Sequence, residues 1–247
     1  MKKRALIDGD VVLYEVTASC EQAYDWGDDM WTFHSDFREA RQKFDCWVAD
    51  LKQVLEAEEV LIALSHKQNW RKGVLETYKA NRKGKRKPLT YPALRQYVEE
   101  TYEYSCMSTL EADDVLGIFA TAPHKTRDEI VVTIDKDLKT VPGLHYNPNH
   151  PEDGVVEVTQ EQADFNHLMQ AVAGDSVDGY SGCPGIGPVR AERMLKDQPD
   201  WAKVVEIYES KKLSADDALV QARVARILRF GEYDQVTETV KLWTPDE

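Results

Sequence analysis

Three carboxylates fall within four residues of the segment Leu110–Leu116, which reads Leu-Glu-Ala-Asp-Asp-Val-Leu. Glu111 and Asp114 are three residues apart, so on a helix they share a face while the flanking Leu and Val side chains pack inward. Acids gathered at the edge of a helix repel one another unless a positive charge lies between them. A divalent cation with oxygen ligands is the usual such charge. For this cluster alone, a solvated acidic turn explains the pattern equally well.

Further acids follow predicted strands and favour the metal interpretation. The apolar run Arg4–Ile7 leads to Asp8, and the apolar run Asp128–Ile134 leads to Asp135. Carboxyl ends of parallel strands meet at one edge of an α/β sheet. Two more acids lie in a glycine-flanked turn, although either could instead cap a helix. The metal-ligand candidates are Asp8, Glu111, Asp113, Asp114, Asp135, Asp137, Asp175 and Asp178. If they converge, two Mg²⁺ or Mn²⁺ ions are the natural occupants, and such a pair can activate water for phosphodiester hydrolysis.

A basic strip lies between the second strand and the next helix. From Lys67 to Lys87, nine Lys or Arg residues stand against one acid, Glu76, in a chain of net charge −13. The overall charge argues against a general nucleic-acid binder. A basic strip on an acidic body, however, suits a protein that grips phosphates in one place and holds metals in another. If the strip is helical, four of its side chains lie near one face: Arg71, Tyr78, Lys79 and Arg82.

Composition and spacing exclude several classes of protein. The four cysteines are far apart, which is typical of reduced thiols in the cytoplasm and not of a disulfide frame or a zinc site. No apolar run approaches membrane-spanning length and no signal segment opens the chain, so we expect a cytoplasmic protein without a membrane partner. A Ser-His-Asp order with an elbow motif is absent, and no small-molecule cofactor is expected.

The pattern of elements changes near Thr159. Before it, strands and helices alternate, including an amphipathic helix at 37–55 and a buried strand at Glu59–Leu64, which predicts an α/β core. After it, the chain is mostly helical. Gly185 and Gly187 precede a helix start and let backbone amides approach a phosphate, although an ordinary loop remains an alternative. We predict an α/β core at 1–158, with the basic strip at about 67–90, and a helical region at 159–247.

Ordered motifs across almost the whole chain resemble the 5′-nuclease (flap endonuclease-like) superfamily. More narrowly, they resemble the 5′→3′ double-strand DNA exonucleases of short-tailed bacteriophages. The motifs are Ile7-Asp-Gly-Asp10, Asn69-Trp-Arg-Lys72, Tyr78-Lys-Ala-Asn-Arg-Lys83, Leu110-Glu-Ala-Asp-Asp-Val115, Asp135-Lys-Asp-Leu-Lys-Thr140, Gly174-Asp-Ser-Val-Asp-Gly-Tyr-Ser-Gly182 and Ala225-Arg-Ile-Leu-Arg-Phe230.

The resemblance implies a fold and a division of roles. The fold is a twisted, mainly parallel sheet flanked by helices (a PIN or flap endonuclease-like core). The basic strip at about 67–90 would form an arch or clamp of this nuclease core at 1–158. A helical DNA-binding region at 159–247 would follow, with a helix-two-turn-helix module at about 174–195 that grips duplex backbone, often with a K⁺ ion. Glu111, Asp113 and Asp114 with Asp8 match the first metal cluster. The other four acids match the second. The residues expected to be catalytic are Lys79, Arg82, Tyr78 and Arg71. The residues expected to contact DNA are Lys72, Lys83, Lys85, Arg86, Gly185, Gly187 and Arg190.

One position departs from the family pattern. Where relatives carry an aspartate after the second strand, this chain has Ser65-His66, and we align His66 with that aspartate. A neutral imidazole binds Mg²⁺ poorly compared with a carboxylate, so we expect the first metal to be held loosely. Asp10 and His66 are uncertain candidates for the site.

The sequence therefore predicts a Mg²⁺-dependent 5′→3′ exonuclease that acts on duplex DNA as a monomer. Some flap or RNA-strand activity is expected, in phage DNA replication and host DNA degradation. The second interpretation is a structure-specific flap endonuclease with little processive activity. The third is a DNA-binding protein that has lost catalysis, which only His66 supports.

Overall fold

A computed structural model describes residues 2–82, 84–123 and 127–245. Within them a six-stranded sheet has the order β5-β4-β1-β6-β7-β8. Its neighbouring strands are parallel except for the antiparallel pair β7–β8. The strands are β1 (Lys2–Asp8), β4 (Glu59–Ala63), β5 (Tyr104–Ser105), β6 (Arg127–Val132), β7 (Gly143–Tyr146) and β8 (Val155–Val158). The predicted mainly parallel sheet is confirmed.

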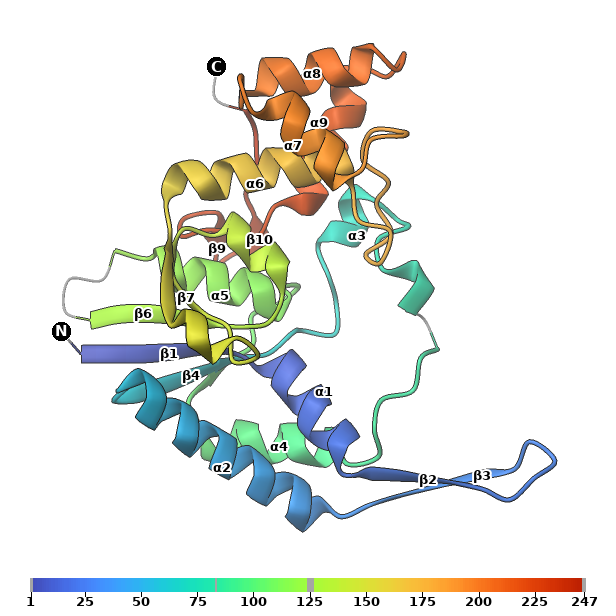
Figure 1. Cartoon of the computed structure of the whole chain (residues 1–247), viewed down its shortest axis with the longest axis vertical. Helices are drawn as coiled ribbons and strands as arrows, with labels where there is room; N and C mark the ends of the chain where they lie inside the picture. The colour runs from blue at the N-terminus through green and yellow to red at the C-terminus, as the bar shows by residue number, and fades with distance from the viewer. Residues whose placement is uncertain (1, 83, 124–126, 246–247) are drawn as a thin grey trace.

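The first helices cover both faces of this sheet. Figure 1 shows α1 (Gly9–Ser19), α2 (Phe37–Leu55) and α4 (Tyr91–Thr101) on one face, and α5 (Ala112–Thr121) on the other. On α2 the buried side chains recur every three or four residues: Ala40, Phe44, Val48, Leu51 and Leu55. This is the apolar stripe that a helix packed on a sheet requires, and it confirms the helix predicted at 37–55.

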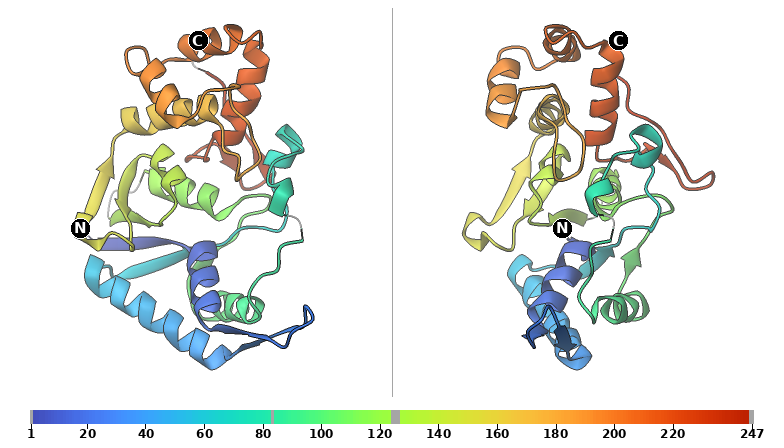
Figure 2. Two further views of the ribbon diagram at one scale, coloured as in Figure 1. Left: turned by 45° about the vertical axis from the view of Figure 1, so that its right-hand side comes forward. Right: turned by 90° about the vertical axis from the view of Figure 1, so that its right-hand side faces the viewer.

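Four helices form a second layer beyond α5, at the end of the molecule opposite α2 (Figures 1 and 2). They are α6 (Gln160–Ala173), α7 (Pro188–Leu195), α8 (Trp201–Glu209) and α9 (Ala215–Ala225). Their core includes Leu195, Val204 and Tyr208. Turns join α6 to α7, and a helix-two-turn-helix module at about 174–195 stays a prediction.

The chain returns to the first core after α9. Ile227 and Leu228 pack beneath α5. On α5 the approach is so close that a Cβ on Gly117 would lie 2.3 Å from the carbonyl oxygen of Leu228. Because this segment belongs to the core of the first region, a division of the chain at 158/159 stays a prediction. A small hairpin, β9 (Tyr233–Asp234) and β10 (Thr239–Val240), follows.

The basic strip does not form one helix. It contains α3 (Arg71–Val74), a single 3-10 turn at Ala80–Arg82 and irregular backbone between them. Lys83, one of the expected DNA contacts, lies outside the described residues. A separate hairpin, β2 (Glu21–Asp25) and β3 (Trp31–Ser35), projects from the body near the end of α1 (Figure 1). Among the described helices, none is long and apolar enough to cross a membrane.

Candidate active site

The carboxyl ends of β1 and β6 and the start of α5 open into one cavity of about 320 Å³, which we call the acid pocket. Seven of the eight predicted metal ligands line it: Asp8, Glu111, Asp113, Asp135, Asp137, Asp175 and Asp178. Asp10, Ser65, Lys79 and Arg82 also line it. Acids that are far apart in the sequence therefore meet at one place.

Local geometry fixes the acids at the strand ends. Asp8 is the last residue of β1 and caps α1, and its carboxylate accepts hydrogen bonds from the amide of Val11 (3.2 Å) and from Oγ1 of Thr133 (3.0 Å). Asp135 begins the 3-10 helix Lys136–Thr140 and accepts a hydrogen bond from the amide of Asp137 (2.8 Å). Because β1 and β6 are parallel neighbours, both carboxylates reach the same edge of the sheet.

A tight turn delivers the last two acids. Asp175 Oδ1 accepts hydrogen bonds from the amides of Val177 (2.7 Å) and Asp178 (3.2 Å), so it stabilises this turn and does not cap a helix. The ends of the turn, Gly174 and Gly182, have φ values of +68° and +60°. A Cβ on Gly182 would lie 2.3 Å from the backbone nitrogen of Gly174. Only glycine fits such a contact, which explains the glycines that flank this motif.

Two cations of the basic strip enter the acid pocket. Nζ of Lys79 lies 2.5 Å from Glu111 and 3.4 Å from Asp178, and Arg82 forms an ion pair with Asp178. The backbone amide of Lys79 also donates to the carbonyl of Asp178 (2.7 Å), which joins the strip to the turn. As the side chains stand, no three described Asp, Glu, His or Cys residues are grouped to hold a metal ion. Glu111 and Asp178 instead contact these cations.

Asp114 is the one predicted metal ligand that the structure does not bring to the acid pocket. Its side chain is fully buried, and its two oxygens accept hydrogen bonds from both terminal nitrogens of Arg71 (2.7 Å each). Nε1 of Trp70 (3.0 Å) and the amide of Leu228 (3.2 Å) donate to the same carboxylate. We therefore correct its expected role from metal ligand to partner of Arg71.

Arg71 and Tyr78 act behind the acid pocket and do not line it. Arg71 is 2% exposed and also donates to Glu111 (3.0 Å) and to the carbonyls of Val224 (2.9 Å) and Arg226 (2.6 Å). The hydroxyl of Tyr78 donates to Glu111 (2.9 Å). Their expected catalytic role becomes one of positioning, because Arg71 reaches the pocket through Glu111 and Tyr78 reaches it through Glu111 and Asp178 (3.2 Å).

The pKa values of the acids reflect their crowding. Burial, followed by the charge of Asp10, raises the pKa of Asp8 to about 7. Burial, followed by Asp135 and Asp175, raises the pKa of Asp137 to about 6. Burial alone would also raise the pKa of Glu111, but the charges of Arg71 and Lys79 overcome it and lower that pKa to about 2. The possible ligand atoms here are carboxylate oxygens, and their crowding disfavours the ionised forms when no cation is bound. Such a set of oxygen donors fits hard divalent cations.

His66 lies outside the acid pocket. Its Nδ1 accepts hydrogen bonds from the amides of Gln68 (3.2 Å) and Thr109 (3.1 Å), so it holds a turn together. Ser65 lines the pocket instead, and its hydroxyl accepts from the amide of Ala112 (2.9 Å). The alignment of His66 with the aspartate of relatives is therefore not supported. The uncertain Asp10 does line the pocket, and its place in Asp8-Gly-Asp10 was the signal for it.

The described residues expected to contact DNA lie mainly on the surface. Lys72 and Lys85 are exposed, whereas Arg86 is paired with Glu21 of β2 and lies over the ring of Phe33 (3.9 Å to the centroid). Three more belong to the loop before α7 and to its first turns: Gly185, Gly187 and Arg190. The guanidinium of Arg190 turns back to the carbonyl of Gly185 (3.4 Å). Their contacts with DNA stay predictions.

Comparison with known proteins places the chain in a family. The family model described as 5′-3′ exonuclease, N-terminal resolvase-like domain, matches residues 5–159. The chain is 29% identical to the exodeoxyribonuclease of Enterobacteria phage T3, over 97% of this chain and 92% of that protein. It is 27% identical to the exonuclease of Escherichia phage T7, over 97% of this chain and 93% of that protein.

A solved structure has the same fold. The bacteriophage T5 flap endonuclease, in a pseudo-enzyme–product complex with DNA and metal ions, superimposes with a TM-score of 0.67 at 12% identity, over 91% of this chain and 89% of that chain. One assignment follows from the match over residues 5–159. It agrees with the shared fold and with the carboxylates that lie beside basic side chains at the strand ends. This chain belongs to the 5′-3′ exonuclease family that carries the N-terminal resolvase-like domain.

Proposed function

We propose that this nuclease is a divalent-metal-dependent 5′→3′ exonuclease that acts on duplex DNA. The observation that carries the proposal is the acid pocket, where seven carboxylates from separate segments face Lys79 and Arg82. The T3 exodeoxyribonuclease and the T5 complex with DNA and metal ions support both the reaction and the metal. Two Mg²⁺ or Mn²⁺ ions are proposed as cofactors, and K⁺ at the loop before α7 is a further proposal.

The roles of the residues follow from their chemistry. The ions would be held by the seven carboxylates of the acid pocket. When bound, divalent cations supply Lewis-acid stabilisation of phosphodiester hydrolysis. Lys79 and Arg82 donate hydrogen bonds to the scissile phosphate in place of their present contacts with Glu111 and Asp178. Arg71 keeps Glu111 ionised and oriented while this exchange occurs.

The biological setting is proposed from the phage relatives. We infer that the protein acts as a monomer in the cytoplasm of an infected host, in DNA replication and in degradation of host DNA. A structure-specific flap endonuclease with little processive activity is the second candidate, favoured by the resemblance to the T5 flap endonuclease fold.

One assay tests the proposal. A duplex labelled at the 5′ or the 3′ end is incubated with Mg²⁺ or with EDTA, and the products are sized on a gel. Short 5′-labelled products that need Mg²⁺ are expected. A single cut at the junction of a flapped duplex, with blunt duplex intact, would instead establish the flap enzyme. Binding without cleavage in Mg²⁺ and in Mn²⁺ would overturn the nuclease mechanism.

A further inference from the structure

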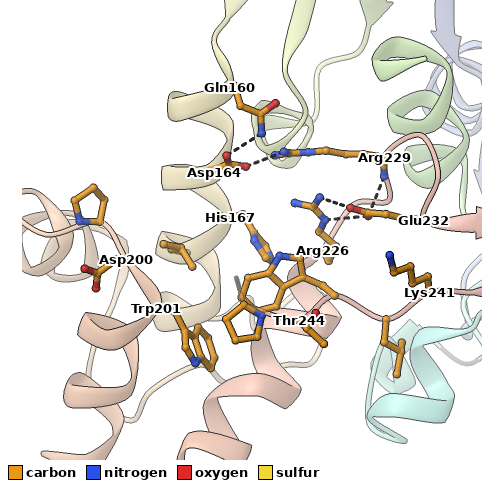
Figure 3. A pocket seen from close by; sticks show the side chains of 15 residues that line it. Gln160, Asp164, His167, Asp200, Trp201, Arg226, Arg229, Glu232, Lys241 and Thr244 are labelled. Carbon is orange, nitrogen blue, oxygen red and sulfur yellow. Dashed lines mark hydrogen bonds and ion pairs between the residues drawn. The ribbon is translucent and has the colours of Figure 1, made fainter. Parts of the chain in front are cut away.

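A second cavity, of about 530 Å³, lies away from the acid pocket. We call it the tryptophan pocket. The first half of α6, the start of α8, the segment after α9 and residues 241–245 surround it (Figure 3). None of its lining residues is among the residues expected from the sequence to bind metal or DNA. Its chemistry therefore needs an explanation of its own.

Aromatic rings form one wall of the tryptophan pocket. Trp201 and Trp243 both line it, with ring centroids 5.3 Å apart and planes at 68°. Trp243 also meets the ring of His167 edge-on, with centroids 4.9 Å apart. Both tryptophans are only partly buried. A planar ring can stack on such a wall, as nucleobases do on aromatic side chains.

A buried hydrogen-bond donor in the same lining lacks an acceptor. Arg229 is 8% exposed, with Nη1 2.7 Å from Asp164 and Nη2 donating to the carbonyl of Thr140 (2.8 Å). Among the buried side-chain nitrogens and oxygens that the structure describes, Nε of Arg229 alone has no hydrogen-bond partner. A buried unpaired donor is costly, so a ligand that brings an acceptor here removes a penalty present in the free protein.

His167 adds an acceptor to this donor. Its Nε2 lies 2.8 Å from the carbonyl of Ala222, and because a carbonyl can only accept, Nε2 carries the proton. Burial, followed by the charge of Arg226, lowers the pKa of His167 to about 3, so the ring is neutral at physiological pH. The other ring nitrogen, Nδ1, is then an acceptor. The lining thus offers a donor and an acceptor close to stacking surfaces.

The charges of the lining limit the ligand to a modest negative charge. Three cations (Arg226, Arg229 and Lys241) are matched by three acids (Asp164, Asp200 and Glu232). Arg226 and Arg229 are already paired with two of these acids, whereas Lys241 is exposed at the edge. A polyphosphate would meet repulsion from the acids. The exposed ammonium of Lys241 can pair with a single phosphate, whereas Nε of Arg229 is buried within the lining and is reached only when neighbouring side chains shift.

We propose that the tryptophan pocket binds one nucleoside 5′-monophosphate unit, with its base against the tryptophans and its phosphate at Arg229 and Lys241. The unit is either a free mononucleotide or the end of a single DNA strand. The binding site is connected to the acid pocket through two elements. Thr140, which accepts from Arg229, ends the 3-10 helix that carries Asp137, and Gln170 of α6 donates to Asp137 (2.8 Å).

Calorimetric titration of the full chain with deoxyadenosine 5′-monophosphate in EDTA tests the proposal. EDTA removes divalent ions, so the readout does not depend on cleavage and can fail or succeed independently of the proposed nuclease activity. We expect one site per chain. Trp243→Ala and Lys241→Gln should each weaken binding about tenfold, the effect of losing one good contact. The matched controls Trp26→Ala and Lys211→Gln, and Asp135→Asn in the acid pocket, should leave it unchanged.

Several results would overturn the proposal. Absence of binding in EDTA, equal affinity for orthophosphate or for deoxyadenosine, and loss of binding in Asp135→Asn each contradict a nucleotide site here. Unchanged affinity in Lys241→Gln also contradicts it. Thermal unfolding shows whether Trp243→Ala is folded, and Lys241→Gln, a surface variant, tests the site if Trp243→Ala is not. A 5′-phosphorylated single-stranded hexanucleotide separates the two sources. Tighter binding than the mononucleotide identifies a strand end, and equal binding identifies a free product.

Discussion

At the scale of single residues, the carboxylates of the acid pocket have different pKa values because their surroundings differ. Glu111 stays ionised because Arg71 and Lys79 outweigh its burial. Burial, and after it the charges of neighbouring acids, raises the pKa values of Asp8 and Asp137. A bound divalent cation would favour the ionised forms of Asp8 and Asp137, whose pKa values are raised without it. We therefore expect the acids that line the pocket to contribute to catalysis more than to stability.

Asp135→Asn should separate these two contributions. The substitution keeps the size of the side chain and removes one ligand charge, so cleavage should fall by about 10² or more while DNA binding persists. Apo stability should not fall, because repulsion in the acid pocket decreases. Single-turnover rates and a filter-binding assay, each in Mg²⁺, measure this. Near-normal turnover would remove Asp135 from the metal site.

His66→Asp should leave the Mg²⁺ dependence of the rate superimposable on that of wild type. The imidazole holds two backbone amides and does not line the acid pocket. Ser65→Asp is the matched variant, because Ser65 does line it, and it should lower the Mg²⁺ concentration needed for half-maximal rate. A shift in His66→Asp with none in Ser65→Asp would restore the sequence-based alignment of His66.

At the scale of elements, Arg71 connects three parts of the chain. It lies at the start of α3, binds Glu111 and Asp114 at the start of α5, and donates to one carbonyl near the end of α9 and to one just after that helix. Lys79 and Arg82 connect the strip to the turn at Asp178. Ion pairs thus hold the basic strip onto the acid pocket.

Asp114→Asn should be costly for stability as well as rate. It leaves the guanidinium of Arg71 buried with one charge partner fewer, and removal of one member of such a pair costs about 3 kcal/mol of unfolding free energy. Asp113→Asn is the control, since Asp113 lines the acid pocket, and it should cost little stability but raise the Mg²⁺ requirement. Urea unfolding and Mg²⁺ titration of both variants decide the matter. Identical behaviour of the two would contradict the division of roles.

Lys79→Ala and Arg82→Ala should slow cleavage of all DNA sequences alike. Each side chain is expected to contact phosphate, so each loss should also reduce the salt dependence of binding by about one unit in the logarithmic slope. Lys43→Ala on α2, remote from the acid pocket, is the matched control. A changed sequence preference with unchanged salt dependence would show that the strip reads bases.

At the scale of the whole molecule, acids gathered in one pocket make stability depend on pH. Asp8 has a pKa of about 7 in the folded protein against an ordinary value of 3.8, so the folded state binds more protons than the unfolded state between these values. Its contribution to stability is present at low pH and is lost as pH rises through 7. His167 acts in the opposite direction below its ordinary value of 6.5, because its folded-state pKa is about 3.

The free energy of unfolding in EDTA should therefore rise by roughly 0.5 kcal/mol between pH 8 and pH 6.5, because the contribution of Asp8 exceeds the opposing one of His167. The gain should diminish at lower pH, where His167 opposes it more strongly. Urea unfolding at a series of pH values measures this. Asp8→Asn should flatten the rise between pH 8 and 6.5, and Mg²⁺ should reduce it by favouring the ionised acids. Stability that falls over this range in EDTA would contradict the raised pKa of Asp8.

Much of the fold follows from local sequence. The stripe of Phe44, Val48 and Leu51 specifies a helix, and apolar runs that end in Asp8 and before Asp135 specify strands with acids at their carboxyl ends. Parallel pairing then brings acids to one edge without any knowledge of distant contacts. For this reason Asp8 and Asp135 could be placed together from the sequence, whereas Asp175 and Asp178 lie in a turn after α6, where strand pairing predicts nothing about their position.

Tertiary structure decided which neighbouring residues face which way. Asp113 and Asp114 are adjacent acids, yet one lines the acid pocket and the other binds buried Arg71, because a helix turns about 100° per residue and the segment at Leu228 packs against one side only. Ser65 and His66 also differ: in the segment just after β4, Ser65 lines the acid pocket and His66 holds a turn. The tryptophan pocket depends on contacts between α6, α8 and the C-terminal segment, and no local pattern records contacts between distant segments.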